Sequence, residues 1–189
     1  REPSPELEAL GIRIEAGVEL TDPDAVAALL LRLEGLKLDL VILNAGILQS
    51  MGLSDLDVEA IRLQFEVNAL APLQLSRALA PQMPHGSKLI LMTSRMGSID
   101  DNSSGGSYGY RMSKVALNMA GRSLAIDLQP NGIAVALLHP GLVRTRMIRF
   151  NSSGIEPEQS VRGLLDRVDA LTLETSGCFW HANGQLLPW

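Results

Sequence analysis

The sequence predicts a doubly wound α/β fold, in which helices cover both faces of a parallel sheet. Short, nearly continuous apolar runs are the first observation, because strands buried on both faces have this composition. The runs are LDLVIL at 38–43, KLILMT at 88–93 and IAVALL at 133–138. The second observation is that segments with apolar residues at helical spacing alternate with these runs. This alternation is typical of right-handed strand–helix–strand crossovers in a three-layer sheet protein.

Two helices and one strand are predicted in the first 36 residues. Ser4-Pro5 and Asp22-Pro23 each combine a capping side chain with a proline suited to the first turn of a helix. The first of these helices is expected to end near Gly11, since glycine is favoured just past a helix end. A strand is expected within residues 12–20, although Gly17 interrupts the segment.

The rest of the chain continues the alternation. Apolar residues at helical spacing predict a helix over 55–83, with a break or kink at Pro72. The polar, glycine-rich segment 98–107 is expected to be a loop. The other predicted elements are helices at 108–128 and 157–173, a turn at 131–132, a flexible stretch at 151–157 and a short strand at 178–180.

Composition narrows the class of protein. The 189 residues suffice for one domain with a sizeable core, and we expect a single domain over 1–189. A net charge of -5 and scattered basic residues argue against nucleic acid or an anionic membrane as a partner. The single cysteine, Cys178, excludes an internal disulfide and favours a reducing compartment, the cytoplasm. We expect neither a membrane helix nor a signal peptide, and His139, Cys178 and His181 lack the spacing of metal ligands.

Tyr110 and Lys114 form a Y-x-x-x-K pair within a predicted helix. Four helical residues advance the chain by about 6 Å and return it to nearly the same face, so the phenol and the ammonium are neighbours. A nearby cation favours the phenolate and lowers the pKa of the tyrosine, as a general acid or base requires. For the pair alone, a solvated helix face is the commoner explanation.

Polar residues follow three predicted strands at the same edge of the sheet. Asn44 and Ser94 each follow a strand, and Pro140-Gly141 closes a third. Ligands of open α/β sheets bind beyond the carboxyl ends of the strands. A tight turn at Asn44 and a capping role for Ser94 are the commoner explanations for each residue alone. The three strand ends together, with the Tyr-Lys helix after the second, favour a ligand site.

An ordered set of motifs resembles the short-chain dehydrogenase/reductase family, and most of all the C-factor and sniffer-type carbonyl reductases. The general motifs are LNAG at 43–46, FEVN at 65–68, LMTS at 91–94, YRMSK at 110–114 and HPGLVRT at 139–145. The more specific ones are TSRMGSI at 93–99, GGSYGYRMSKVALN at 105–118 and SGCFWHANGQLLPW at 176–189. The resemblance implies a Rossmann-like fold.

The resemblance also implies a catalytic role for four residues. Tyr110 corresponds to the acid that protonates the substrate oxygen during hydride transfer. Lys114 corresponds to the residue that lowers the tyrosine pKa and holds the nicotinamide ribose. Ser94 corresponds to the hydroxyl that orients the carbonyl. Asn68 corresponds to the residue that supports a water leading from the lysine to solvent, although capping a broken helix is an alternative.

Further positions correspond to cofactor contacts. The turn Asn44-Ala45-Gly46 is expected beside the adenosine ribose, with Tyr110 and Lys114 at the other end of the cofactor. Val143 and Thr145 are expected at the nicotinamide carboxamide. Leu20 is expected at the adenine, where Glu19 replaces the aspartate usual in the family. Arg1 is expected to pair with a 2′-phosphate, so NADP(H) is favoured and NAD(H) is possible.

One family motif is absent from the sequence. No T-G-x-x-x-G-x-G turn for the cofactor pyrophosphate occurs in the chain. The resemblance therefore implies that strands 1 and 2 of the family fold are missing, that the chain is N-terminally incomplete and that the active protein is longer. It also implies a gap two strands wide between the predicted strand at 12–20 and that at 38–43.

The favoured function is NAD(P)-dependent hydride transfer between a nicotinamide and a small carbonyl or alcohol substrate. The alternatives are a non-catalytic family member acting in signalling or subunit pairing, and a related epimerase or dehydratase, which the short C-terminal region disfavours. Segment 146–157, with Met147, Ile148 and Phe150, is expected to line an apolar substrate pocket. By resemblance, the helices at 55–83 and 108–128 are expected to form a homodimer or tetramer, unless they only cover the sheet.

Overall fold

The computed structural model describes residues 3–189, which fall into two compact units. The first ends at Leu36 and the second runs from Lys37 to Trp189. Each unit is described by itself. Arg1, the predicted partner of a 2′-phosphate, lies outside the described residues.

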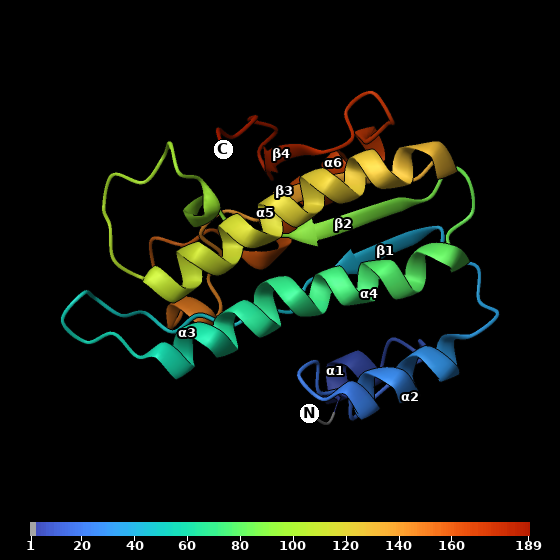
Figure 1. The fold of residues 1–189 in the computed structure, drawn as a ribbon, viewed down its shortest axis with the longest axis horizontal. Coiled ribbons are helices and arrows are strands. Elements are labelled where there is room, and N and C mark those ends of the chain that lie inside the picture. The colour runs from blue at the N-terminus through green and yellow to red at the C-terminus, as the bar shows by residue number, and fades with distance from the viewer. Residues whose placement is uncertain (1–2) are drawn as a thin grey trace. The chain divides into compact units, whose positions relative to one another are not determined.

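The first unit contains the two predicted helices, α1 (Pro5–Glu8) and α2 (Pro23–Leu33) (Figure 1). Ser4 Oγ accepts a hydrogen bond from the Leu7 N–H at 3.3 Å, and Asp22 Oδ1 accepts one from the Asp24 N–H at 2.9 Å. These bonds satisfy N–H groups that a helix start leaves free. Both predicted helix starts are confirmed.

The strand predicted at 12–20 is wrong, because the segment has no strand structure. A strand needs a neighbour to bond its N–H and C=O groups, and this unit contains no other strand among its described residues. Gly17 also has a φ of +72°, which breaks the extended conformation. An ion pair of Glu15 with Arg32 (2.5 Å) ties the segment to α2 instead. Because the strand at 12–20 is absent, the gap expected between it and the strand at 38–43 does not arise.

The second unit is built on a four-stranded parallel sheet in the order β1-β2-β3-β4 (Figure 1). The register pairs Val41 with Leu89, Leu89 with Val135, and Leu137 with Phe179. All four predicted strands of this unit are confirmed, and so is the doubly wound α/β fold. The strands are β1 (Leu40–Leu43), β2 (Lys88–Met92), β3 (Ala134–His139) and β4 (Cys178–His181).

Strand β1 differs from the expectation that it is buried on both faces. Its outer edge pairs with no strand among residues 3–189, whereas β2 and β3 have neighbours on both sides. Leu40 and Ile42 are accordingly 41% and 45% exposed. The apolar run predicted the strand correctly, but its burial depends on neighbours that the sequence pattern does not specify.

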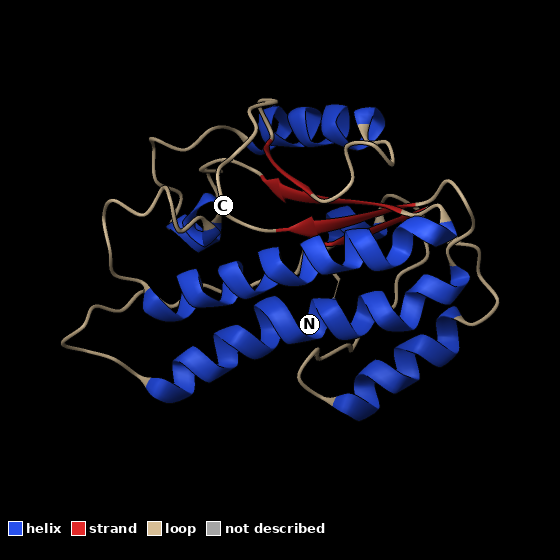
Figure 2. Cartoon of the chain, turned by 45° about the horizontal axis from the view of Figure 1, so that its top comes forward, coloured by secondary structure: helices blue, strands red, loops and turns tan. Residues whose placement is uncertain are grey.

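Helices cover both faces of the sheet (Figure 2). Alternate residues of β2 and β3, including Ile90 and Ala136, pack against Val168 of α6 (Pro157–Ala170). The intervening Leu91 and Leu137 face Gly121 of α5. Helices α3 (Val58–Phe65) and α4 (Ala71–Leu79) lie on the same face of the sheet as α5 (Tyr108–Leu128). No helix among residues 3–189 has the length and apolar character to cross a membrane.

The break predicted near Pro72 is a π-helical segment, Glu66–Leu70, between α3 and α4. Pro72 lies in the first turn of α4, where its missing N–H costs least. Such segments often occur at functional sites, and this one carries Asn68. Short 3₁₀ turns complete the unit at Ala80–Gln82, Arg95–Gly97, Gln129–Asn131 and Arg146–Ile148.

We predict that Gly163→Ala lowers the free energy of unfolding by about 1–3 kcal/mol. Alanine normally stabilises a helix interior relative to glycine by about 1 kcal/mol. Here a Cβ would lie 2.3 Å from the backbone oxygen of Ala182, so α6 would have to move away from the segment after β4. Urea unfolding measures the effect. Arg162→Ala, at the exposed neighbouring position, is the control, and a Gly163→Ala variant more stable than wild type would contradict the prediction.

Candidate active site

A cavity of about 1030 Å³ opens at the carboxyl edge of the sheet in the second unit. Most predicted site residues line it, although they come from separate segments that follow β1, β2 and β3 or lie on α5. This juxtaposition is what the strand-end argument predicted. The predicted residues that line the cavity are Asn44, Ala45, Gly46, Ser94, Tyr110, Lys114, Val143 and Thr145.

Helix α5 places Tyr110 and Lys114 on one buried face. Tyr110 is 7% exposed and Lys114 is 4% exposed. Lys114 Nζ lies 5.7 Å from the centre of the Tyr110 ring. The same nitrogen donates a hydrogen bond to the backbone oxygen of Met92, at the end of β2, at 2.9 Å. The pair is therefore part of the cavity wall and not of a solvated helix face.

Burial shifts the pKa of both groups toward their neutral forms. Desolvation raises the pKa of Tyr110 above its ordinary value, while a hydrogen bond with Ser94 lowers it by less. Desolvation also lowers the pKa of Lys114, to about 8. The expected lowering of the tyrosine pKa is thus wrong for this structure, because the loss of water outweighs the hydrogen bond with Ser94. The phenol remains a neutral proton donor at pH 7.

Asn68 is fully buried and its amide holds the chain after β1. Its Oδ1 accepts from the Ile47 N–H at 2.8 Å, and its Nδ2 donates to the Ile47 carbonyl at 2.9 Å. Nδ2 also donates to Ser113 Oγ at 3.0 Å. A Cβ on Gly46 would lie 3.3 Å from Asn68 Oδ1 and 3.5 Å from Lys114 Nζ. Asn68 therefore fixes the turn beside Lys114, and its predicted link to a water stays a prediction.

Ser94 follows β2 and is 7% exposed. Its Oγ accepts a hydrogen bond from the Met96 N–H at 3.2 Å, so the capping role is present. The same side chain lines the cavity and interacts with the Tyr110 phenol. Because a hydroxyl can accept one bond while it donates another, Ser94 combines both roles.

Residues that the sequence analysis did not single out complete the support of α5. Asn118 Oδ1 accepts from Thr93 Oγ1 at 2.6 Å, and its Nδ2 donates to the Gly97 carbonyl at 3.0 Å. A Cβ on Gly97 would lie 2.9 Å from the backbone carbon of Lys114, so only glycine allows this approach. Asn118 lies four residues after Lys114, and this helical spacing could have identified it.

The cavity has a polar wall and an apolar wall. Met147 and Ile148 line it as expected, together with Leu142, Val161 and Leu164. Phe150 does not line it. It is 62% exposed and has a φ of +54°, which turns the chain at this point. The polar wall is formed by Arg95, Asp101, Ser103, Ser104 and Arg111.

The cavity does not test two of the predictions, the adenine contact of Leu20 and the spacing of metal ligands. Leu20 belongs to the first unit, so its expected adenine contact stays a prediction. Residues 3–189 contain no cluster of histidine, cysteine and acidic side chains that could hold a metal ion. His139 and His181 instead stack edge-on, with ring centres 4.9 Å apart.

We predict that Lys114 makes stability depend on pH between about 8 and 10.5. In this range the unfolded chain keeps the proton that the buried lysine has lost, so the free energy of unfolding rises with pH. The rise is at most about 1.4 kcal/mol per pH unit for one proton. Urea unfolding of the wild type and of Lys114→Met measures it as their difference. Lys37→Met, at an exposed position, is the control. A difference that falls with pH would refute the assignment.

Several relatives match most of the chain, among them one from Rhodococcus and one from Myxococcus xanthus. A protein of Rhodococcus sp. (strain AD45), "1-hydroxy-2-glutathionyl-2-methyl-3-butene dehydrogenase", is 44% identical over 189 residues, covering 97% of this chain and 84% of its own. "C-signal" of Myxococcus xanthus is 43% identical over 154 residues, covering 80% of this chain and 92% of its own.

Solved structures share the fold. A carbonyl reductase from chicken fatty liver, bound to NADPH, has a TM-score of 0.86 and 30% identity, covering 97% of this chain and 82% of its own. The carbonyl reductase Sniffer of D. melanogaster has a TM-score of 0.84 and 31% identity, covering 91% and 76%. The short chain dehydrogenase family model matches residues 6–155. The chain, with its Tyr110–Lys114 pair at the carboxyl edge of a parallel sheet, therefore belongs to the short-chain dehydrogenase family.

Proposed function

We propose that the protein is an NADP(H)-dependent oxidoreductase that transfers hydride to or from a small carbonyl or alcohol substrate. The observation that carries this proposal is the meeting of Ser94, Tyr110 and Lys114 in one cavity beside the Asn44–Gly46 turn. A hydroxyl, a phenol and an amine around a cavity are suited to proton transfer at a carbonyl oxygen. The cavity has the size of a small-molecule site.

In the direction of reduction, Tyr110 donates its proton to the carbonyl oxygen, which Ser94 orients by a hydrogen bond. The raised pKa of Tyr110 keeps the phenol protonated until this step. The phenolate that remains lies beside Lys114, and a protonated lysine there lowers the cost of the negative charge. When bound, the nicotinamide supplies the hydride.

The cavity residues fit the nicotinamide and ribose end of such a cofactor. Lys114 Nζ has three donors as an ammonium, and only the bond to Met92 is present among the described residues. The other two can meet ribose hydroxyls. Gly46 leaves room for close approach at this point, because a Cβ there would lie 3.5 Å from Nζ. Val143 and Thr145 are suited to the carboxamide. The NADPH of the chicken carbonyl reductase supports NADP(H) over NAD(H).

A second candidate is a family member that acts in signalling. The name of the Myxococcus xanthus relative, "C-signal", favours it. This function does not require turnover, but it does not explain why the Tyr110 phenol and the Lys114 amine are buried together in a cavity wall. Removal of the Tyr110 hydroxyl distinguishes the two functions, since it strongly slows catalysis and leaves a binding function intact.

Three further predictions from the sequence remain predictions. A homodimer or tetramer is supported by exposed apolar side chains on α3 and α5, namely Leu63, Met112, Met119 and Ile126. A cytoplasmic location rests on the cysteine content alone. A single domain over 1–189 is supported by the family match, which spans parts of both units.

We predict that Tyr110→Phe lowers kcat by a factor of about 10²–10⁴, the usual contribution of a general acid. The substitution removes the proton and keeps the ring. The decrease in NADPH absorbance with an aldehyde substrate, at saturating cofactor, measures the rate. Tyr108→Phe is the matched control, because Tyr108 is in the same helical turn but does not line the cavity. Unchanged turnover in Tyr110→Phe would remove this residue from the mechanism.

We also predict that the 189-residue chain binds NADPH more weakly than micromolar. Pyrophosphate binding in such folds uses a glycine-rich turn at a helix N-terminus, and the sequence contains none. Nicotinamide fluorescence measures the dissociation constant. Reduced nicotinamide mononucleotide is the control ligand, and it should bind about as well as NADPH because no glycine-rich turn of the chain anchors the pyrophosphate. A micromolar constant for NADPH would show that other residues hold the pyrophosphate.

A further inference from the structure

The polar wall of the cavity carries two guanidinium groups and one carboxylate. Arg95 forms an ion pair with Asp101, so these two charges compensate each other. Arg111 has no acidic partner among residues 3–189. The polar wall therefore carries one guanidinium without an acidic partner, at the residue that directly follows the proposed proton donor.

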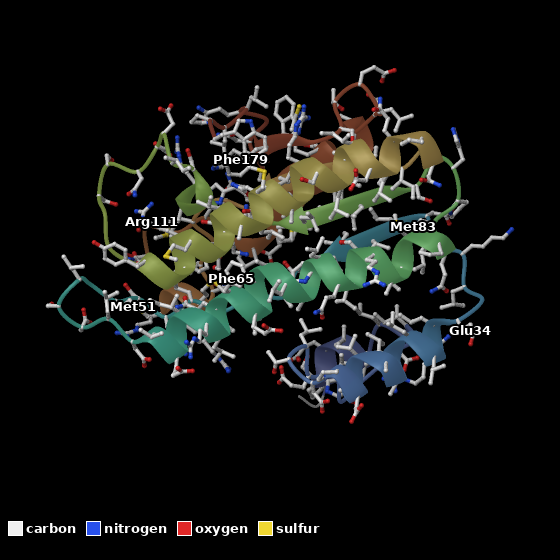
Figure 3. The ribbon with its side chains drawn as sticks, viewed as in Figure 1. Glu34, Met51, Phe65, Met83, Arg111 and Phe179 are labelled. Carbon is white, nitrogen blue, oxygen red and sulfur yellow. The ribbon has the colours of Figure 1, made fainter. Side chains whose placement is uncertain are left out.

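Neighbouring groups hold the Arg111 side chain in place. Its Nε donates to the Gly106 carbonyl at 3.2 Å, and its Nη2 donates to Ser104 Oγ at 2.8 Å. Figure 3 shows the side chain beside the loop that precedes α5. Two bonds fix the plane of the guanidinium, and Nη1 donates to no residue that the structure describes. A rigid fork with free donors is suited to a carboxylate, which accepts two parallel hydrogen bonds from arginine.

The position of Arg111 relates this charge to the reaction. It follows Tyr110 directly in the first turn of α5, so both side chains begin from one rigid element. The apolar wall includes Leu142, Ile148 and Leu164. A molecule that fills the cavity would thus meet a proton donor, the Arg111 guanidinium, the Lys114 amine and an apolar surface.

We propose that the substrate is a carbonyl compound, or the matching alcohol, that carries a carboxylate, and that Arg111 binds this carboxylate. The inference rests on the proposed oxidoreductase function and names its substrate class. Binding energy at a group remote from the reacting carbon orients the carbonyl toward Tyr110. A purely structural role for Arg111, holding the loop before α5, would use only Nε and Nη2 and would give no preference for an anion.

The test compares 4-carboxybenzaldehyde with its methyl ester, which has similar shape and no charge. Binding to the 189-residue chain is measured by calorimetry without cofactor, so that it does not depend on turnover. We expect the acid to bind about tenfold to a hundredfold more tightly, the range of a charge-assisted hydrogen bond. In Arg111→Gln the ratio of the two constants should fall toward one, because only Lys114 remains as a cation without an acidic partner in the lining. A loosened loop affects both ligands alike, so the ratio isolates the charge.

Arg77→Gln is the matched control, because it removes the same charge from an exposed position outside the cavity. It should keep the preference for the acid. Equal binding of acid and ester by the wild type would overturn the proposal, and so would a preference that survives in Arg111→Gln. Failure of both ligands to bind would also overturn it. None of these outcomes affects the Tyr110→Phe result with a neutral aldehyde, so the inference and the proposed function can fail separately.

Discussion

The hydrogen bond from Lys114 Nζ to the Met92 carbonyl fixes the rest of the site. It joins α5 to the end of β2, and it forms only because Gly97 lets the helix backbone approach closely. Asn118 ties the same helix to Thr93 and Gly97 one turn further on. Once α5 is held at this position, Tyr110 faces the cavity and Ser94 lies within reach. The geometry of the candidate site thus follows from how one helix packs on the end of one strand.

This packing sets the electrostatics as well as the geometry. The burial that positions Tyr110 and Lys114 removes water from both, and each then favours its neutral form. In the proposed mechanism, proton transfer from Tyr110 produces a buried phenolate, which a charged lysine stabilises and a neutral one does not. With the pKa of Lys114 at about 8, both forms of the amine are accessible near neutral pH. The proposed mechanism therefore requires a protonated Lys114, although burial of this lysine favours its neutral form.

Sequence patterns predicted what depends on local spacing and failed where neighbours decide. Helix α5 was predicted with both its ends, because a glycine-rich loop precedes it and the Asn131-Gly132 turn follows. The strand at 12–20 failed because strand formation requires a partner, and the exposure of Ile42 at the sheet edge was missed for the same reason. The sign of the Tyr110 pKa shift depends on burial, which the Y-x-x-x-K spacing does not encode. Arg111 was missed as well, because its proposed role depends on Asp101 forming an ion pair with Arg95 and not with Arg111.

Asn68 is buried and does not line the cavity, and its contacts fix the chain after β1. Strands β2 and β3 have neighbours on both sides, so their ends are fixed by the sheet. Among residues 3–189, strand β1 has a neighbour on one side only, and the turn at Gly46 that follows it lies beside Lys114. The Asn68 amide donates to the Ile47 carbonyl and accepts from the Ile47 N–H, as the backbone of a strand partner would. A single side chain from the π-helical segment Glu66–Leu70 thus fixes the turn that follows β1, in line with the frequent occurrence of such segments at functional sites.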